Sequence, residues 1–107
     1  MEQSIGKAEA RLKVFEGGGV EKFREWVMKN LTYPEIALNG DISGRVNMIF
    51  GVDRNGNVCD IKVLRSVNPY LDNEATRVLI SSPKWIPAKQ NGKYVKQNFT
   101  IPIVFNK

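Results

Sequence analysis

The sequence contains no histidine and only one cysteine, Cys59. Without histidine, the chain has neither a His-containing catalytic triad nor a His-based metal site or proton relay. A single cysteine forms no internal disulfide, and we interpret Cys59 as a small buried residue of a strand. The sequence also has no apolar run of the roughly 18 residues that a membrane-spanning helix requires, and no apolar signal-peptide core near its start.

The composition is that of a single globular domain, since the 107 residues are 42% hydrophobic and 25% charged. Sixteen Lys and Arg residues against eleven Asp and Glu residues give a net charge of +5, but the charges are scattered along the chain. Scattered charge indicates a solvated surface. A weak attraction to an anionic polymer or surface is the alternative interpretation.

Residues 1–16 are polar and charged, and we expect them to form a flexible leader or linker remnant with a helical turn near residues 8–12. Glycines at 17–19 open the domain, which we assign to residues 17–107. Apolar residues at helical spacing predict an amphipathic helix over residues 20–31, with the stripe Phe23, Trp26, Val27 and Leu31. Pro34 makes Tyr33 extended and so ends this helix, and it also begins a short helical turn that ends at residues 39–40.

A β-hairpin is predicted next. Apolar residues alternate over residues 45–53, which indicates a strand with one buried face: Val46, Met48, Phe50 and Val52. The following Asn55-Gly56 pair tolerates the positive φ angles of a hairpin turn. A second strand over residues 58–66 completes the hairpin and buries Ile61 and Val63.

A second helix is predicted over residues 69–82, because Asn68 suits the capping position and Pro69 the first helical position. Pro83 ends this helix, whose inward stripe is Leu71, Ala75, Val78, Leu79 and Ser82. We expect residues 84–87 to be extended, with Trp85 in the core. Residues 88–93 are expected to form a loop.

The last strand is predicted over residues 94–105, where apolar residues alternate at Val95, Phe99, Ile101, Ile103 and Phe105. Pro102 lacks the N–H group that a sheet requires, and proline is confined largely to edge strands, strand ends and bulges. We therefore place this strand at the sheet edge, beside the first strand and with its other side open. The predicted fold is a two-layer α+β domain, with a three-stranded antiparallel sheet and two helices packed on one face.

Short motifs follow one another in a distinctive order along residues 14–106: Tyr33-Pro34, Gly44-Arg45-Val46, Val52-Asp53, Asn55-Gly56, Val63-Leu64-Arg65-Ser66, Leu71-Asp72, Glu74-Ala75, Pro83-Lys84-Trp85, Pro87, Lys89-Gln90 and Gly92-Lys93. This ordered set resembles the TonB C-terminal domain family, especially Bacteroidetes-type energy transducers. The resemblance implies a periplasmic domain of an inner-membrane-anchored protein. In that family the domain binds the TonB box, a short extended segment of outer-membrane transporters.

The resemblance also implies that proton-motive force arrives from an inner-membrane motor complex through regions absent from this sequence. We therefore expect the chain to be an excised fragment or a soluble relative that does not drive transport alone. The family's peptide pairs with the last strand, which matches the edge inferred from Pro102. We expect no cofactor and no metal, and the predicted peptide-binding residues are Tyr33, Pro34, Tyr94, Lys96, Gln97, Asn98, Thr100 and Ile101.

Three alternatives stay open. In the first, the chain is a structural or sensory periplasmic domain, for example of a peptidase-like receptor, and its basic charge suits a contact with peptidoglycan. In the other two, the edge strand is an ordinary one protected by lysine, or two copies of the domain form a homodimer by strand exchange.

Catalysis and nucleic-acid binding are not expected. The acidic pairs Asp53 with Asp60 and Asp72 with Glu74 lie at a turn and a helix start, where both have structural explanations. Basic and aromatic residues interleave over residues 84–94 without forming a stacking platform on a strand.

Overall fold

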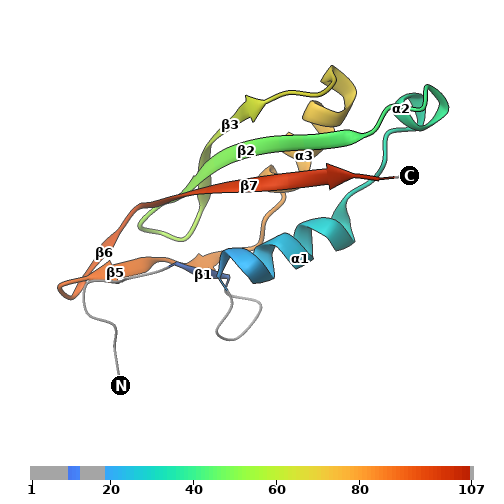
Figure 1. Cartoon of the computed structure of the whole chain (residues 1–107). Helices are drawn as coiled ribbons and strands as arrows, with labels where there is room; N and C mark the ends of the chain where they lie inside the picture. Colours follow the sequence, from blue (N-terminus) through green and yellow to red (C-terminus); the bar gives the residue numbers. More distant parts are fainter. Residues whose placement is uncertain (1–9, 13–18, 107) are drawn as a thin grey trace.

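The computed structural model describes residues 10–12 and 19–106 of the chain. Its centre is an antiparallel sheet in the order β3-β2-β7, formed by β2 (Gly44–Val52), β3 (Val58–Arg65) and β7 (Gln97–Phe105). Helices α1 (Val20–Asn30) and α3 (Pro69–Ile80) lie on one face of this sheet (Figure 1). The predicted two-layer α+β fold is confirmed, and the last strand lies beside the first strand of the hairpin as expected.

The hydrophobic core fills the space between the sheet and the two helices. Phe23 of α1 stacks on Trp26 and contacts Phe50 and Trp85, with ring centroids 5.1 to 5.6 Å apart. These rings anchor α1 to the sheet and to the segment after α3. The side chains buried almost completely include Phe23, Val27, Val46, Met48, Phe50, Val52, Leu71, Ala75, Val78, Leu79, Trp85, Ile101, Ile103 and Phe105.

The turns and caps follow the sequence-based expectations. The Asn68 side chain accepts a hydrogen bond of 2.9 Å from the Tyr70 N–H, which caps α3. In the β2–β3 turn, the Asp53 carboxylate accepts hydrogen bonds of 2.9 Å from the N–H groups of Asn55 and Asn57. The bond from Asn57 is the main reason that the pKa of Asp53 lies below its ordinary value.

Gly56 in the same turn is required for two reasons. Its φ of +85° lies in the left-handed region, and a Cβ atom there would lie 2.1 Å from the carbonyl oxygen of Trp85. The Gly56 carbonyl also accepts a 2.9 Å hydrogen bond from the Trp85 N–H. The turn is thereby fixed against the chain that follows α3.

The expected helical turn near residues 8–12 is wrong. Residues Arg11–Leu12 form a short strand, β1, which pairs antiparallel with β4 (Trp85–Ile86). Ala10 is 1% exposed, so this part of the expected leader belongs to the folded domain. Pairing with a distant segment overrides the local helix propensity here. The rest of the expected flexible leader, residues 1–9 and 13–16, lies outside the described residues.

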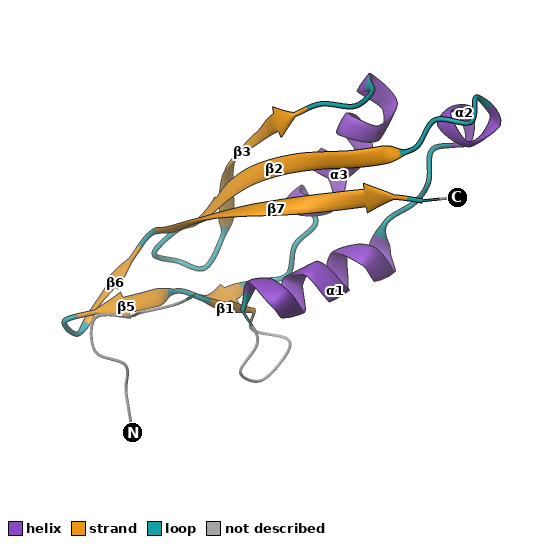
Figure 2. Ribbon diagram, in the orientation of Figure 1, coloured by secondary structure: helices purple, strands orange, loops and turns teal. Residues whose placement is uncertain are grey.

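The expected loop over residues 88–93 is also wrong, because β5 (Ala88–Gln90) and β6 (Lys93–Val95) form a second hairpin. Asn91 and Gly92 supply its turn, with φ values of 53° and 78°. The run expected to form one strand over residues 94–105 is therefore divided between β6 and β7, and Lys96 separates them. This hairpin and the β1–β4 pair lie at one end of the molecule (Figure 2).

The short helix α2 (Glu35–Asn39) lies at the other end of the sheet (Figure 2), and its bounds agree with the predicted helical turn after Pro34. Among the described residues, no helix is both long enough and apolar enough to cross a membrane. Cys59 is only partly buried rather than buried as expected, and its sulfur lies 3.3 Å from the position that a Cβ atom on Gly51 would occupy. Burial raises the pKa of this thiol.

Candidate functional site

The outer edge of β7 is the candidate site. All nine residues of β7 are in register with β2, from Gln97 opposite Val52 to Phe105 opposite Gly44. No described strand pairs with the other edge of β7. Pro102 lies opposite Asn47 within this paired stretch. Proline has no N–H group to donate to β2. The sheet therefore loses no hydrogen bond at Pro102 only if the backbone of this residue faces away from β2, toward the free edge.

The two-residue repeat of a strand extends this orientation to the neighbours of Pro102. The backbones of Asn98, Thr100 and Val104 face the free edge as well. These three residues direct three N–H groups outward. Together with Pro102, which has a carbonyl but no N–H, they direct four carbonyl groups outward. The side chains of Asn98 and Thr100 are exposed.

Ile101 lies on the opposite phase of this repeat. Its side chain is 1% exposed and packs in the core, and its residue partner on β2 is Met48. By the same alternation its backbone faces β2. The geometry therefore groups Asn98 and Thr100 of the predicted set with Val104, a position that the sequence-based set omits. Counting in steps of two from Pro102 identifies Val104 from the sequence alone.

The start of the free edge is marked by Lys96, which lies where β6 gives way to β7. Its side chain crosses Gly51 of β2 and forms an ion pair with Asp60 of β3. A Cβ atom on Gly51 would lie 2.8 Å from Cε of Lys96, so glycine leaves room for this crossing. The hydrogen bond from Lys96 holds the pKa of Asp60 below its ordinary value and raises the pKa of Lys96.

Two further predicted residues lie at this end. Tyr94 belongs to β6, opposite Lys89 of β5, and the Lys89 Nζ atom lies 5.1 Å from the centroid of its ring. The Gln97 side chain accepts a 2.6 Å hydrogen bond from the Ala10 N–H. Both side chains therefore have partners within the domain, and Tyr94 lies beyond the β7 edge rather than on it.

Tyr33 and Pro34 lie at the opposite end of β7. The Tyr33 ring packs edge-on against Phe105, with centroids 5.6 Å apart, and its hydroxyl donates to the carbonyl of Ile42. Pro34 is extended and precedes α2. The structure therefore places Tyr94 near one end of β7 and Tyr33 at the other, with the exposed residues Asn98 and Thr100 between them.

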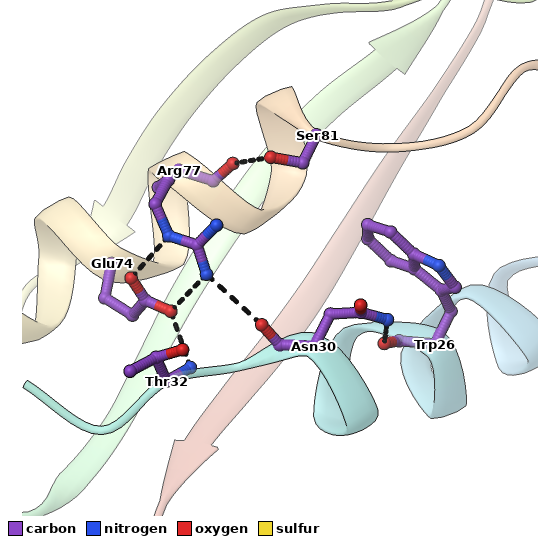
Figure 3. A network of polar contacts seen from close by, with 6 residues as sticks. All are labelled: Trp26, Asn30, Thr32, Glu74, Arg77 and Ser81. Carbon is purple, nitrogen blue, oxygen red and sulfur yellow. Dashed lines mark hydrogen bonds and ion pairs between the residues drawn. The ribbon is translucent and has the colours of Figure 1, made fainter.

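A polar network on α3 holds the chain just before Tyr33 (Figure 3). The Glu74 carboxylate accepts a 2.6 Å hydrogen bond from the Thr32 N–H and two bonds of 2.7 Å from Arg77. Arg77 also donates to the Asn30 carbonyl at 3.2 Å, which ties the end of α1 to α3. The network therefore fixes the connection between α1 and α2 at the residues that directly precede Tyr33.

The pKa of Glu74 reflects its place in this network. Its side chain is 10% exposed, and burial by itself raises its pKa. The hydrogen bonds from Arg77 and Thr32 outweigh burial, so the pKa of Glu74 lies below its ordinary value. The carboxylate is thus held in its charged form, in which it accepts all three bonds. Sequence reasoning gave Glu74 only a place near a helix start.

Within residues 10–12 and 19–106, no three His, Cys, Asp or Glu residues gather at metal-binding distance.

Comparison with known proteins identifies a family and similar solved structures. Residues 29–106 match the sequence family described as "Gram-negative bacterial TonB protein C-terminal". The chain is similar to the solution structure of the Pseudomonas aeruginosa TonB C-terminal domain, with 30% sequence identity and a TM-score of 0.60 over 71% of this chain and 77% of that one. It is also similar in fold to the Helicobacter pylori TonB C-terminal domain, with 24% identity and a TM-score of 0.62 over 81% of this chain and 91% of that one. The search of curated proteins found no match.

Proposed function

Because the chain belongs to the family of TonB C-terminal domains, we propose that it is the peptide-binding end of a TonB-type energy transducer. The free edge of β7 takes up the TonB box of an outer-membrane transporter as an added strand. The domain acts in the periplasm, on a parent protein anchored in the inner membrane. It works by binding and not by catalysis, and force from an inner-membrane motor complex reaches the transporter through the bound peptide.

The observation that carries this proposal is the exposed backbone of β7 around Pro102. Asn98, Thr100 and Val104 direct N–H groups to the free edge, and proline at 102 costs the sheet nothing there. Edge strands are commonly shielded by bulges or by covering loops. Here the nine residues of β7 run in unbroken register with β2, which leaves a regular template for another strand.

The expected affinity is modest. A peptide of five or six residues makes about five hydrogen bonds to this edge, each with a net value of about 0.5 to 1.5 kcal/mol. Ordering the peptide consumes part of that free energy. A weak and reversible complex suits a domain that must release its transporter after each cycle.

The test is an NMR titration of the 15N-labelled domain. The peptides are copied from the periplasmic N-terminal segments of outer-membrane transporters encoded in the same genome. We expect the largest shifts at the amides of Asn98, Thr100 and Val104, because these N–H groups gain partners. The amides of Ile101 and Ile103, which face β2, should move less.

Two controls sharpen this test. A dilution series without peptide detects strand exchange between two copies, which would move the same amides. If no transporter peptide shifts the β7 amides at millimolar concentration, the proposal is wrong, and a structural or sensory periplasmic domain is the better interpretation.

A further inference from the structure

The net positive charge of the chain comes from its last third. Glu74 is the last acidic residue of the sequence, and residues 75–107 contain six Lys and Arg residues. Residues 1–74 contain ten Lys and Arg residues and all eleven Asp and Glu residues, so their charges nearly cancel. The net charge of +5 therefore belongs to the segment that follows Glu74.

The fold gathers much of this charge at one end of the molecule. The hairpin of β5 and β6 lies at that end (Figure 2) and exposes Lys89 and Lys93. The β2–β3 turn adds Arg54, which is also exposed. Lys84 connects this turn to β4, because its Nζ atom donates a 2.9 Å hydrogen bond to the Asn55 carbonyl. We call this end the basic pole, and its cations are Arg54, Lys84, Lys89 and Lys93.

Acidic residues of the domain neutralise little of the basic pole. Within the described part of the chain, none of its four cations forms an ion pair. The Asp53 carboxylate lies in the same turn as Arg54 and offsets one charge, while it accepts hydrogen bonds from two backbone N–H groups. Asp60 is paired with Lys96. The basic pole therefore keeps a net positive charge, which attracts anionic surfaces.

A hollow in the basic pole brings two of its cations to one place. Its volume is about 350 Å³, and its walls include Arg54, Lys84, Ile86, Pro87 and Tyr94. Lys84 uses one of its three N–H donors on the Asn55 carbonyl, and the five donors of Arg54 have no partner among the described residues. A phosphate group accepts hydrogen bonds from both kinds of cation. The hollow therefore suits a phosphate at its rim.

Apolar side chains beside this hollow favour a lipid surface as its partner. Ile86 is 47% exposed and Tyr94 is 51% exposed, and the Lys89 Nζ atom lies 5.1 Å from the centroid of the Tyr94 ring. Basic residues next to aromatic and aliphatic ones are typical of surfaces that enter the headgroup layer of a membrane. An anionic glycan is attracted by the same charge, but it offers Ile86 no apolar environment.

We propose that the basic pole docks on an anionic phospholipid bilayer. One lipid phosphate lies between Arg54 and Lys84, and the side chains of Ile86 and Tyr94 enter the headgroup layer. If the parent protein is anchored as proposed above, this bilayer is the periplasmic leaflet of the inner membrane. Tyr33 lies at the opposite end of β7, so a docked domain directs that end of the free edge away from the lipid. The docking itself does not depend on strand addition.

The experiment measures co-sedimentation of the chain with vesicles, without any peptide. Anionic vesicles contain about one-quarter phosphatidylglycerol in phosphatidylethanolamine, and neutral vesicles contain phosphatidylcholine alone. The test variant combines Lys89→Gln with Lys93→Gln. The matched control combines Lys29→Gln with Arg45→Gln, which removes the same charge from exposed positions outside the basic pole. Gln90→Lys adds a charge to the exposed end of β5.

We expect the wild-type chain to bind anionic vesicles and not neutral ones. The test variant should bind anionic vesicles about thirtyfold more weakly, because each basic residue near an anionic surface contributes substantially to binding. The matched control should lose less than about threefold, since its charges lie farther from the bilayer. Gln90→Lys should bind about fivefold more tightly, a gain that a misfolded variant cannot produce. Ile86→Thr should weaken binding about three- to fivefold, because less apolar surface enters the headgroup layer.

Three results would overturn the docking. If the test variant and the matched control lose equal affinity, only the net charge acts and the basic pole is not a docking surface. If the wild-type chain sediments with purified peptidoglycan but not with anionic vesicles, its partner is a glycan. If glycerol phosphate shifts the Arg54 amide in NMR spectra while vesicles do not bind, the hollow takes up only a free anion.

A failure of the docking is separate from a failure of the proposed function. Lys89 and Lys93 lie outside β7, so the test variant should bind transporter peptides as the wild-type domain does. If peptides shift the β7 amides but anionic vesicles do not bind, the docking is wrong and strand addition stands. If vesicles bind but no peptide does, the reverse holds.

Discussion

Replacing Thr100 by proline is the most direct test of the free edge. The Thr100 N–H faces outward in the same phase as Pro102, so the substitution removes a donor from the peptide complex and none from the sheet. The lost hydrogen bond has a net value of about 0.5 to 1.5 kcal/mol, which corresponds to a two- to twelvefold weaker affinity for the peptide. The Thr100 side chain is exposed, so its loss should change the free energy of unfolding by less than about 1 kcal/mol.

The assay pairs two measurements on the same variants. Peptide affinity is obtained from the NMR titration, and the free energy of unfolding from urea denaturation. Thr100→Ala is the control for the side chain, because it keeps the N–H group and should bind nearly as well as wild type. Phe99→Pro is the control for the direction in which the backbone N–H points. The Phe99 backbone faces β2, so this substitution should destabilise the fold by about 3 kcal/mol or more.

Two results would refute this reasoning. If Thr100→Pro destabilises the fold as much as Phe99→Pro, the Thr100 N–H serves the sheet and the assigned phase of β7 is wrong. If Thr100→Pro keeps both full stability and full peptide affinity, the peptide does not pair with this edge.

Three further predictions concern the residues that support the edge. Gly56→Ala should destabilise the domain by about 2 to 4 kcal/mol in urea denaturation, because a Cβ atom would lie 2.1 Å from the Trp85 carbonyl oxygen at a φ of +85°; an unchanged midpoint would contradict that contact. Glu74→Gln should cost about 1 to 2 kcal/mol near pH 7, and since the pKa of Glu74 is lowered in the folded state, the difference from wild type should disappear as the pH falls through that lowered pKa; a pH-independent difference would count against the charged network. Gly51→Ala should displace Lys96 and let the pKa of Asp60, followed by NMR, rise toward its ordinary value, whereas an unchanged pKa would show that Lys96 reaches Asp60 by another path.

The parts of the fold that short-range signals control could be predicted from the sequence. Asn68-Pro69 begins α3, and Asn55-Gly56 turns the first hairpin, because caps and turns depend on the residues at those positions. The edge position of the last strand followed from Pro102, because a missing N–H group restricts where a strand can lie in any sheet.

The parts that depend on distant partners could not be predicted. Residues Arg11–Leu12 become a strand only because Trp85–Ile86 lies beside them, and the sequence shows no sign of that pairing. Glu74 likewise acquires its role from Thr32, which is 42 residues away. In each case tertiary packing brings together groups whose local sequence context is unremarkable.

In the proposed complex, the continuous register of β7 with β2 also determines how the bound peptide resists a pull. A peptide hydrogen-bonded along β7 and drawn along the strand axis is loaded in shear, so that all its bonds to the edge share the tension and must fail together. The same peptide drawn sideways is unzipped, one bond after another, at much lower force. A short interface with a modest equilibrium affinity can therefore transmit considerable tension in one direction and let go easily in another.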